Sequence, residues 1–198
     1  MIILLFLASL IVTAAFLSKR SSCLLNAAAI GFTSIGLSSL IFVSFQIYCG
    51  GLFWKMGILI GLFMAGLSAG TLIMDSFKIE NRKFLALIYA FWAIIILSLY
   101  LSLRYFVKLS YPDIVFYLYS LVCGTITGGS YPLLARDLKE NKFQHGNITT
   151  AIYSADLTGA FLGTLLFGTL LIPFLGIPQN LAALIALNII FALKNLLL

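Results

Sequence analysis

The alternation of apolar and polar positions divides the chain into long apolar stretches joined by short polar connections. A helix needs about 20 apolar residues to cross roughly 30 Å of hydrocarbon. On this criterion the sequence predicts seven membrane-spanning helices, at residues 2–17, 24–48, 53–74, 84–107, 114–134, 149–172 and 180–198. We therefore expect an all-α fold, a polytopic membrane helical bundle that forms one integral membrane domain over residues 1–198.

The composition excludes most soluble classes of protein. Of the 198 residues, 62% are hydrophobic and only 9% are charged, whereas a soluble domain is about half apolar and a quarter charged. A core of this size does not hide such an excess, which excludes a small soluble enzyme and a disordered chain. The cysteines, Cys23, Cys49 and Cys123, are isolated. They predict neither a disulfide framework nor a zinc site, and we expect no cofactor.

The basic residues predict the orientation in the membrane, because cytoplasmic loops carry an excess of Lys and Arg. With seven spans, three basic residues fall on one side and nine on the other, namely Lys19, Arg20, Lys78, Arg82, Lys83, Arg136, Lys139, Lys142 and Lys194. No basic residue precedes the first span, which favours a retained helix over a signal peptide. We expect a multi-pass protein of the plasma or inner cell membrane, with its N-terminus outside, its C-terminus cytoplasmic and no nucleic-acid partner.

The chain contains an internal repeat. An ungapped offset of 93 residues aligns Gly31 with Gly124, Gly36 with Gly129, Gly66 with Gly159, and Gly70 with Gly163. These matches predict one copy over residues 23–105 and a second over 116–198, with 1–22 as an extra N-terminal helix. Each copy has three spans, an odd number, so the second copy is inverted across the membrane. Inverted three-helix repeats are the building plan of many secondary transporters.

Small residues indicate where helices approach closely, because close backbone contact drives helix association in lipid. The third span carries Gly57, Gly61, Ala65 and Ala69 on one stripe, with Gly66 and Gly70 beside it. The sixth carries Ala155, Gly159 and Gly163, beside Ala160, Thr164 and Gly168. We interpret these stripes as packing surfaces. The fifth span ends in Gly128-Gly129-Ser130-Tyr131-Pro132, which predicts a kink or break because Pro132 lacks an amide donor.

Asp156 is the only charge well inside a predicted span, about 10 Å deep. An ionised Asp near the centre of a helix costs about 2.5–3.5 kcal/mol on insertion scales, so a partner, water or protonation must offset it. Two interpretations stay open: a proton or cation site, or a structural hydrogen bond to Ser34, Thr33 or Gln46. The candidate solute or ion site comprises Asp156, Gln46, Tyr153 and Ser38.

The sequence lacks the residue combinations of a membrane enzyme. The only histidine, His145, lies in a polar connection, so no nucleophile–histidine pair is expected within a span. A two-aspartate protease needs a second deep carboxylate, and Asp75 is too shallow. We therefore expect no enzymatic activity.

Two stretches, residues 30–74 and 128–176, carry the features of a known family. These features are Gln46 with Gly50, Phe63-Met64-Ala65-Gly66-Leu67, Gly129 with Tyr131-Pro132-Leu133, and Tyr153-x-Ala155-Asp156-Leu157-x-Gly159. They resemble the membrane part of polytopic spermidine-synthase-like proteins, in which a major-facilitator-like membrane region is fused to a soluble aminopropyltransferase domain. The soluble domain is absent from this sequence, so the resemblance does not imply spermidine synthesis. Ser38 also replaces a Glu that the family tends to carry.

Two functions remain open at this point. The first is a small transporter, assembled as a homodimer of halves in the lipid bilayer, that moves a small polar or cationic solute past Asp156. The second is a non-catalytic membrane anchor or scaffold subunit for a separately encoded partner.

Overall fold

The computed structural model describes residues 19–50, 52–76, 82–105, 112–140 and 145–197, and contains no strand in these ranges. The prediction of an all-α chain is confirmed for this part, whereas the predicted span 2–17 lies outside it. The elements are α2 (Lys19–Cys49), α3 (Phe53–Ser76), α4 (Arg82–Tyr105), α5 (Pro112–Glu140), α6 (His145–Leu166), a π-helical turn η1 (Phe167–Leu171) and α7 (Ile172–Leu197).

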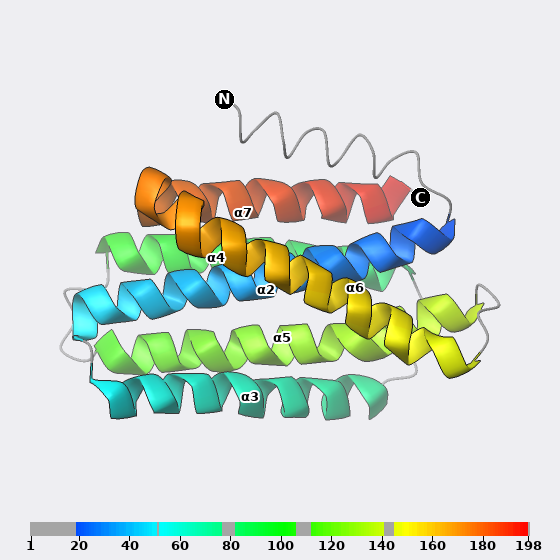
Figure 1. Cartoon of the computed structure of the whole chain (residues 1–198), viewed down its shortest axis with the longest axis horizontal. Coiled ribbons are helices and arrows are strands. Elements are labelled where there is room, and N and C mark those ends of the chain that lie inside the picture. Colours follow the sequence, from blue (N-terminus) through cyan, green and yellow to red (C-terminus); the bar gives the residue numbers. More distant parts are fainter. Residues whose placement is uncertain (1–18, 51, 77–81, 106–111, 141–144, 198) are drawn as a thin grey trace.

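Five segments of the described chain are long and apolar enough to cross a membrane, against about seven in the prediction. The fifth, Ile148–Leu196, is 49 residues long and covers the predicted span 149–172 and all but the last two residues of the predicted span 180–198. Within it, Gly176 has a non-helical backbone with φ 73° and ψ 175°, and α6 and α7 run in opposite directions (Figure 1). The chain therefore reverses its direction at Gly176, without a longer loop between the two helices.

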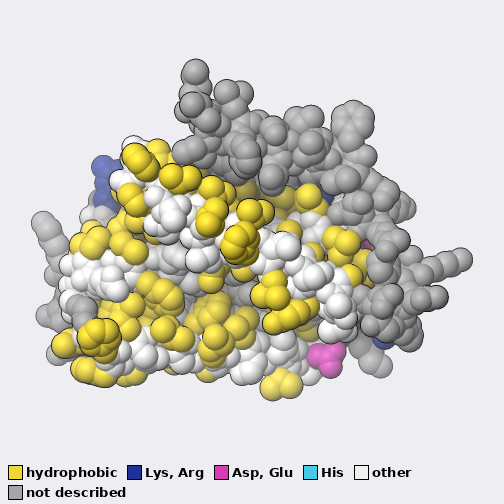
Figure 2. All heavy atoms as spheres, viewed as in Figure 1, with side chains coloured by type: hydrophobic (Ala, Val, Ile, Leu, Met, Phe, Trp, Pro, Cys, Tyr) yellow, Lys and Arg dark blue, Asp and Glu magenta, His cyan; other side chains and the backbone are white. Residues whose placement is uncertain are grey.

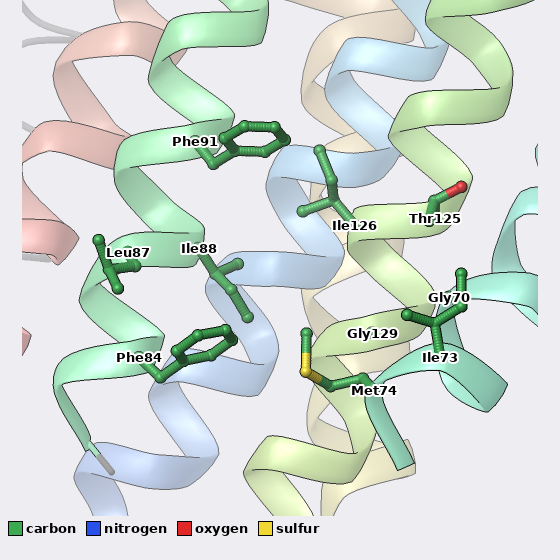
Figure 3. Close-up of a pocket in the computed structure, with 10 residues that line it drawn as sticks. All are labelled: Gly70, Ile73, Met74, Phe84, Leu87, Ile88, Phe91, Thr125, Ile126 and Gly129. Carbon is green, nitrogen blue, oxygen red and sulfur yellow. The ribbon is translucent and has the colours of Figure 1, made fainter. Parts of the chain in front are cut away.

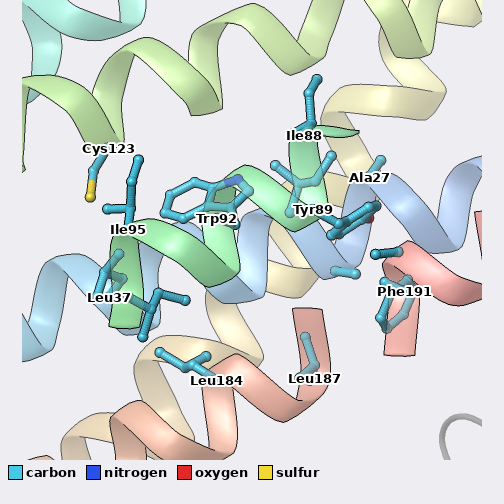
Figure 4. Packing of buried hydrophobic residues seen from close by; sticks show 14 of the residues in the cluster. Ala27, Leu37, Ile88, Tyr89, Trp92, Ile95, Cys123, Leu184, Leu187 and Phe191 are labelled. Atoms are coloured by element: carbon cyan, nitrogen blue, oxygen red, sulfur yellow. The ribbon is translucent and has the colours of Figure 1, made fainter. Parts of the chain in front are cut away.

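The helix at the centre of the bundle is α2, which contacts α5, α6 and α7, while α3 packs on α5 and α4 on α7 (Figure 1). A buried apolar core lies where α2, α4 and α7 meet. It includes Leu37 and Trp92, and the rings of Tyr89 and Phe191 stack there with centroids 5.4 Å apart (Figure 4). Large hydrophobic side chains also cover the outside (Figure 2). A membrane protein needs such a lipid-facing surface, whereas a soluble monomer rarely has one.

Glycine brings α3 and α5 into backbone contact. Four glycines, two on each helix, lie where any side chain would collide with the partner helix. A Cβ atom built on each would lie 2.0–2.3 Å from a backbone carbonyl oxygen of the partner; the four are Gly66, Gly70, Gly124 and Gly128. Gly66 and Gly70 are therefore packing positions, as the sequence indicates. In lipid, this close approach supplies the dispersion contacts that hold helices together.

The contacts between α2 and α6 repeat those between α5 and α3 at the offset of 93 residues. Three of the four glycines between α3 and α5 have a glycine counterpart between α6 and α2, whereas Gly128 corresponds to Ile35. The matched contacts are Gly66–Leu121 with Gly159–Ala28, and Gly124–Phe63 with Gly31–Asp156. Gly163 also packs on α2, where a Cβ atom would lie 2.5 Å from Cγ2 of Ile35.

The other predicted stripe of α3 is not a packing surface within this chain. Gly57, Gly61, Ala65 and Ala69 are exposed, and a Cβ atom on either glycine would meet nothing within 4 Å. The two stripes lie on neighbouring faces of one helix, so the sequence alone does not show which of them meets α5. In the structure it is the face that carries Gly66 and Gly70.

Of the predicted kink or break near Pro132, the break is absent. The helix α5 continues through Pro132 to Glu140. Before the proline, Gly128 contacts the backbone of Leu67 on α3, and after it Arg136 donates hydrogen bonds to the end of α3. Because α3 supports α5 on both sides of Pro132, the loss of one amide donor does not interrupt the helix.

Alanine substitution should separate the two glycine faces of α3. Gly70→Ala places a methyl group 2.0 Å from the carbonyl oxygen of Thr125, so we expect the unfolding free energy in detergent to fall by about 1–3 kcal/mol. Gly61→Ala, the matched control, enters open space and should change the unfolding free energy by less than about 0.5 kcal/mol. Equal effects of the two substitutions would contradict the packing described here.

Candidate functional site

Asp156 lies in the middle of its helix, eleven residues after the first residue of α6 at His145. Its depth is about 12 Å from the start of the apolar segment at Ile148. The other acidic residues in the described part of the chain lie within four residues of a helix end; they are Asp75, Asp113, Asp137 and Glu140. Asp156 is therefore the carboxylate that the fold places inside the bundle.

The carboxyl group of Asp156 is held between three helices. The hydroxyl of Tyr131 on α5 donates a hydrogen bond to Oδ2. The other oxygen, Oδ1, packs against α2 at Gly31, where a Cβ atom would lie only 2.7 Å from it. Gly31 thus creates the space that the carboxyl group fills, and Tyr131 satisfies part of its hydrogen-bonding capacity. An unpaired carboxylate in hydrocarbon would be far more costly.

The local structure of α5 places Tyr131 beside Asp156. The helix is continuous through Gly128, Gly129 and Ser130, and the Ser130 hydroxyl donates back to the carbonyl of Thr127 at 2.6 Å. Ser130 is fully buried, whereas Tyr131 is half-buried and reaches toward α6. The segment that the sequence indicates as a break is therefore an ordered helix that carries the partner of Asp156.

The predicted site residues do not all come together. Gln46 is exposed near the end of α2, about 22 Å along the helix from Gly31. Ser38 is buried about 10 Å from Gly31 along the same helix, and its hydroxyl has no hydrogen-bond partner within the described residues. Tyr153 is one turn before Asp156 on α6 and is 58% exposed.

The predicted hydrogen-bond partners of Asp156 were wrong. Ser34 donates to the carbonyl of Gly31 at 3.1 Å, Thr33 has no hydrogen-bond partner in the described part of the chain, and Gln46 is too far away. Tyr131 is not among the partners predicted from the sequence, because the glycines and the proline of this segment indicate a change in the backbone and not a side-chain contact. The available signal was a tyrosine inside an apolar span, since a buried tyrosine hydroxyl usually has a partner.

Two ion pairs hold the ends of α3 and α5 together. Lys55 and Asp113, at the first turns of the two helices, form one pair. At the opposite end, Nη2 of Arg136 lies 3.4 Å from Oδ1 of Asp75 and donates to the carbonyl oxygens of Met74 and Asp75 at 3.4 and 3.0 Å. These charges lie at helix ends, so they serve to join the two helices.

No family model matches the chain, and no curated protein or solved structure matches it either. The described residues also contain no cluster of three or more metal-ligating side chains.

A double-mutant cycle measures the bond between α5 and α6. Tyr131→Phe combined with Asp156→Ala should show a coupling of about 0.5–2 kcal/mol in the unfolding free energy, typical of hydrogen bonds between membrane helices. The control cycle replaces Tyr131→Phe with Tyr153→Phe, because Tyr153 is exposed and has no role in this bond. It should show no coupling. Equal coupling energies in the two cycles would show that Tyr131 is not the hydrogen-bond partner of Asp156.

Proposed function

We propose that the chain is a transporter-like membrane protein that moves a small polar or cationic solute, with Asp156 as the binding carboxylate. The observation that carries this proposal is the position of Asp156, inside an apolar span and at the junction of α2, α5 and α6. A carboxylate at such depth is costly unless it has a function or a partner. Tyr131 provides one hydrogen bond, which leaves further acceptor sites on the carboxylate for a proton or a cation.

The contacts between helices support an inverted repeat of the kind from which many secondary transporters are built. Under the offset of 93 residues, α2, α3 and α4 correspond to α5, α6 and α7. The contact of α3 with α5 then corresponds to that of α6 with α2, in agreement with the glycine contacts. The helices α2 and α5, which begin the two copies, run in opposite directions (Figure 1). A two-fold relation in the membrane plane explains both features.

Tyr131 gives the proposed site a means of exchange. Its hydroxyl occupies one oxygen of Asp156, and an arriving cation that binds both carboxylate oxygens displaces it. When the solute leaves, the hydrogen bond forms again and the carboxylate is not left bare in the hydrocarbon. The pair therefore lowers the cost of the empty site.

The resemblance to the membrane part of spermidine-synthase-like proteins belongs to the same proposal. Two of its motifs, Tyr131-Pro132-Leu133 and the stretch around Asp156, supply the two partners of the hydrogen bond. We also propose the orientation given by the basic residues, which places the Arg136 end of α5 in the cytoplasm.

A second candidate is a non-catalytic anchor or scaffold subunit for another polypeptide. The observation that favours it is the exposed stripe of Gly57, Gly61, Ala65 and Ala69 on α3. Small residues at this spacing support close helix packing in lipid, and no described helix of this chain covers them. The transporter proposal assigns the same stripe to a second copy of the chain.

Uptake into proteoliposomes tests the role of Asp156. We expect the unaltered chain to take up radiolabelled putrescine or choline, the cationic probes, faster than glucose, the uncharged probe. Asp156→Asn should reduce the uptake of the cation at least ten-fold because the negative charge is lost. Tyr131→Phe should change the rate of cation uptake several-fold.

The matched control for this assay is Asp75→Asn, which removes an exposed carboxylate at the end of α3. It should leave uptake unchanged. If no probe enters with the unaltered chain, or if Asp156→Asn transports at the normal rate, the proposal fails.

Native mass spectrometry of protein extracted from its own host membrane separates the two candidates. A complex of two copies supports the transporter, and a stoichiometric complex with another polypeptide supports the anchor. In either case Gly61→Leu should weaken the association, because it adds bulk to the exposed stripe. Gly168→Leu is the control, since Gly168 is equally open but lies in η1. Equal loss with the two variants would exclude the stripe as the contact.

A further inference from the structure

The bundle has an apolar groove near one end of α4 and a more polar pocket near the other end. The groove has a volume of about 350 Å³ and lies between α3, α4 and α5, where Phe84, Phe91 and Met74 line it (Figure 3). The one side-chain hydroxyl in its lining is that of Thr125, which donates to the carbonyl of Leu121 at 2.8 Å. The lining of the groove therefore offers no polar group that would select an occupant.

The pocket at the other end of α4 has a volume of about 420 Å³ and lies between the ends of α2 and α4 and the reversal within α7. Small-molecule sites in proteins have volumes of about 300–1,000 Å³. Three polar side chains line the pocket, those of Tyr48, Tyr100 and Arg104. The rest of its lining is apolar and consists of Leu103, Ile177, Pro178 and Leu181. This lining suits a molecule that has an anionic head and an apolar body.

The pocket lies at the boundary of the apolar spans. Arg104 is the last residue of the span Phe84–Arg104, and Tyr48 is the last but one of the span Ser22–Cys49. Tyrosine is common at the boundary between membrane and water, where it anchors a helix. Here the tyrosines also line a hollow, which an anchoring role does not require. A pocket at this level can receive a molecule from the water or from the bilayer.

The hydroxyls of Tyr48 and Tyr100 have no hydrogen-bond partner among the residues that the structure describes. The ring of Tyr48 stacks on that of Phe116 with centroids 6.5 Å apart, so its position is held by packing. In contrast, the fully buried Tyr89 on α4 donates its hydroxyl to the carbonyl of Asn26 at 3.0 Å. Each of the two pocket tyrosines can therefore donate a hydrogen bond to a ligand.

The end of the bundle that contains the pocket has a net positive charge. The charged side chains that the structure describes at this end are those of Lys55, Arg104 and Asp113, and Lys55 and Asp113 form an ion pair. The connection 106–111 adds Lys108 to the sequence and no acidic residue. Arg104 is exposed and lies in the last turn of α4, where a cation is favourable for the helix dipole. Because a guanidinium has several N–H donors, it can hold a carboxylate and keep contacts within the protein.

We propose that this pocket binds an amphipathic monocarboxylate, a single carboxylate group on an apolar body. The carboxylate pairs with Arg104 and accepts hydrogen bonds from Tyr48 and Tyr100, and the apolar body packs on Leu103 and the start of the second part of α7. Planar pairing of guanidinium and carboxylate gives this head group its advantage over an uncharged one. The two acyl chains of a phospholipid do not fit this volume. The site is separate from Asp156 and does not require that the protein transport anything.

Equilibrium dialysis against radiolabelled 4-phenylbutyrate tests the site, with the protein in phosphatidylcholine nanodiscs and empty nanodiscs as background. We expect one molecule bound per chain, at least ten-fold more tightly than 4-phenyl-1-butanol, the uncharged analogue. Arg104→Gln should weaken the binding of 4-phenylbutyrate at least ten-fold, and Arg104→Lys should weaken it less because the charge remains. Tyr48→Phe combined with Tyr100→Phe should weaken it several-fold. Leu103→Trp fills the pocket and should abolish most of the binding, so the test does not depend on the charge variant alone.

Two matched variants serve as controls. Leu101→Trp adds the same bulk at an exposed position of α4 outside the pocket, and Arg136→Gln removes a guanidinium that pairs with Asp75 at the opposite end of the bundle. Both should bind 4-phenylbutyrate as the unaltered chain does. Absence of saturable binding, equal binding of the uncharged analogue, or normal binding by Leu103→Trp would overturn the proposal.

Competition identifies the source of the ligand. Oleate partitions into the bilayer and benzoate stays in the water, so displacement of 4-phenylbutyrate by the first indicates a fatty acid and displacement by the second alone indicates a soluble organic acid. Either result supports a carboxylate site at Arg104. Displacement by phosphatidylglycerol as effective as that by oleate would overturn it, because the occupant would then be a phospholipid head group.

Discussion

Backbone contact at glycine is the constraint on which the rest of the bundle depends. The buried residues of α3 are Leu59, Gly66 and Gly70, so two of the three positions at which this helix is buried have no side chain. Burial of apolar groups contributes little to helix association in a bilayer, because lipid is apolar as well. The association of α3 with α5 depends instead on close backbone approach, on ion pairs at both helix ends and on the hydrogen bond that Ser120 donates to the carbonyl of Leu59 at 2.7 Å.

The proposed site at Asp156 lies where the halves of the chain differ. At the shared offset, the counterpart of Asp156 is Phe63 and that of Tyr131 is Ser38. One half therefore has a hydrogen-bonded carboxylate, whereas the other has a phenylalanine and a serine whose hydroxyl has no hydrogen-bond partner within the described residues. The groove between α3, α4 and α5 likewise lies where Met74 occupies the position that corresponds to Phe167. The contacts that the two halves share supply the architecture, and residue differences between the halves of the proposed repeat add polar chemistry or empty space to it.

Much of the helical architecture could be predicted from the sequence, because span length and apolar composition depend on the bilayer and not on tertiary contacts. The role of Gly66 and Gly70 was also predictable, but the choice between their face and that of Gly57 and Gly61 was not, since it depends on the position of α5. The continuity of α5 through Pro132 depends on support from α3. Gln46 does not lie close to Asp156, because it is about 22 Å along α2 from Gly31, which contacts Asp156.

The pairing of the helices also has a consequence for biogenesis. The helices leave the ribosome in chain order, yet α3 packs on α5 and α2 on α6, so the main partner of each emerges later. Until α5 is synthesised, the glycine face of α3 is not covered by its partner helix, and Lys55 lacks its ion-pair partner Asp113. Assembly therefore cannot proceed hairpin by hairpin, and a pause in translation after α4 would leave an intermediate that exposes these glycines to other membrane helices.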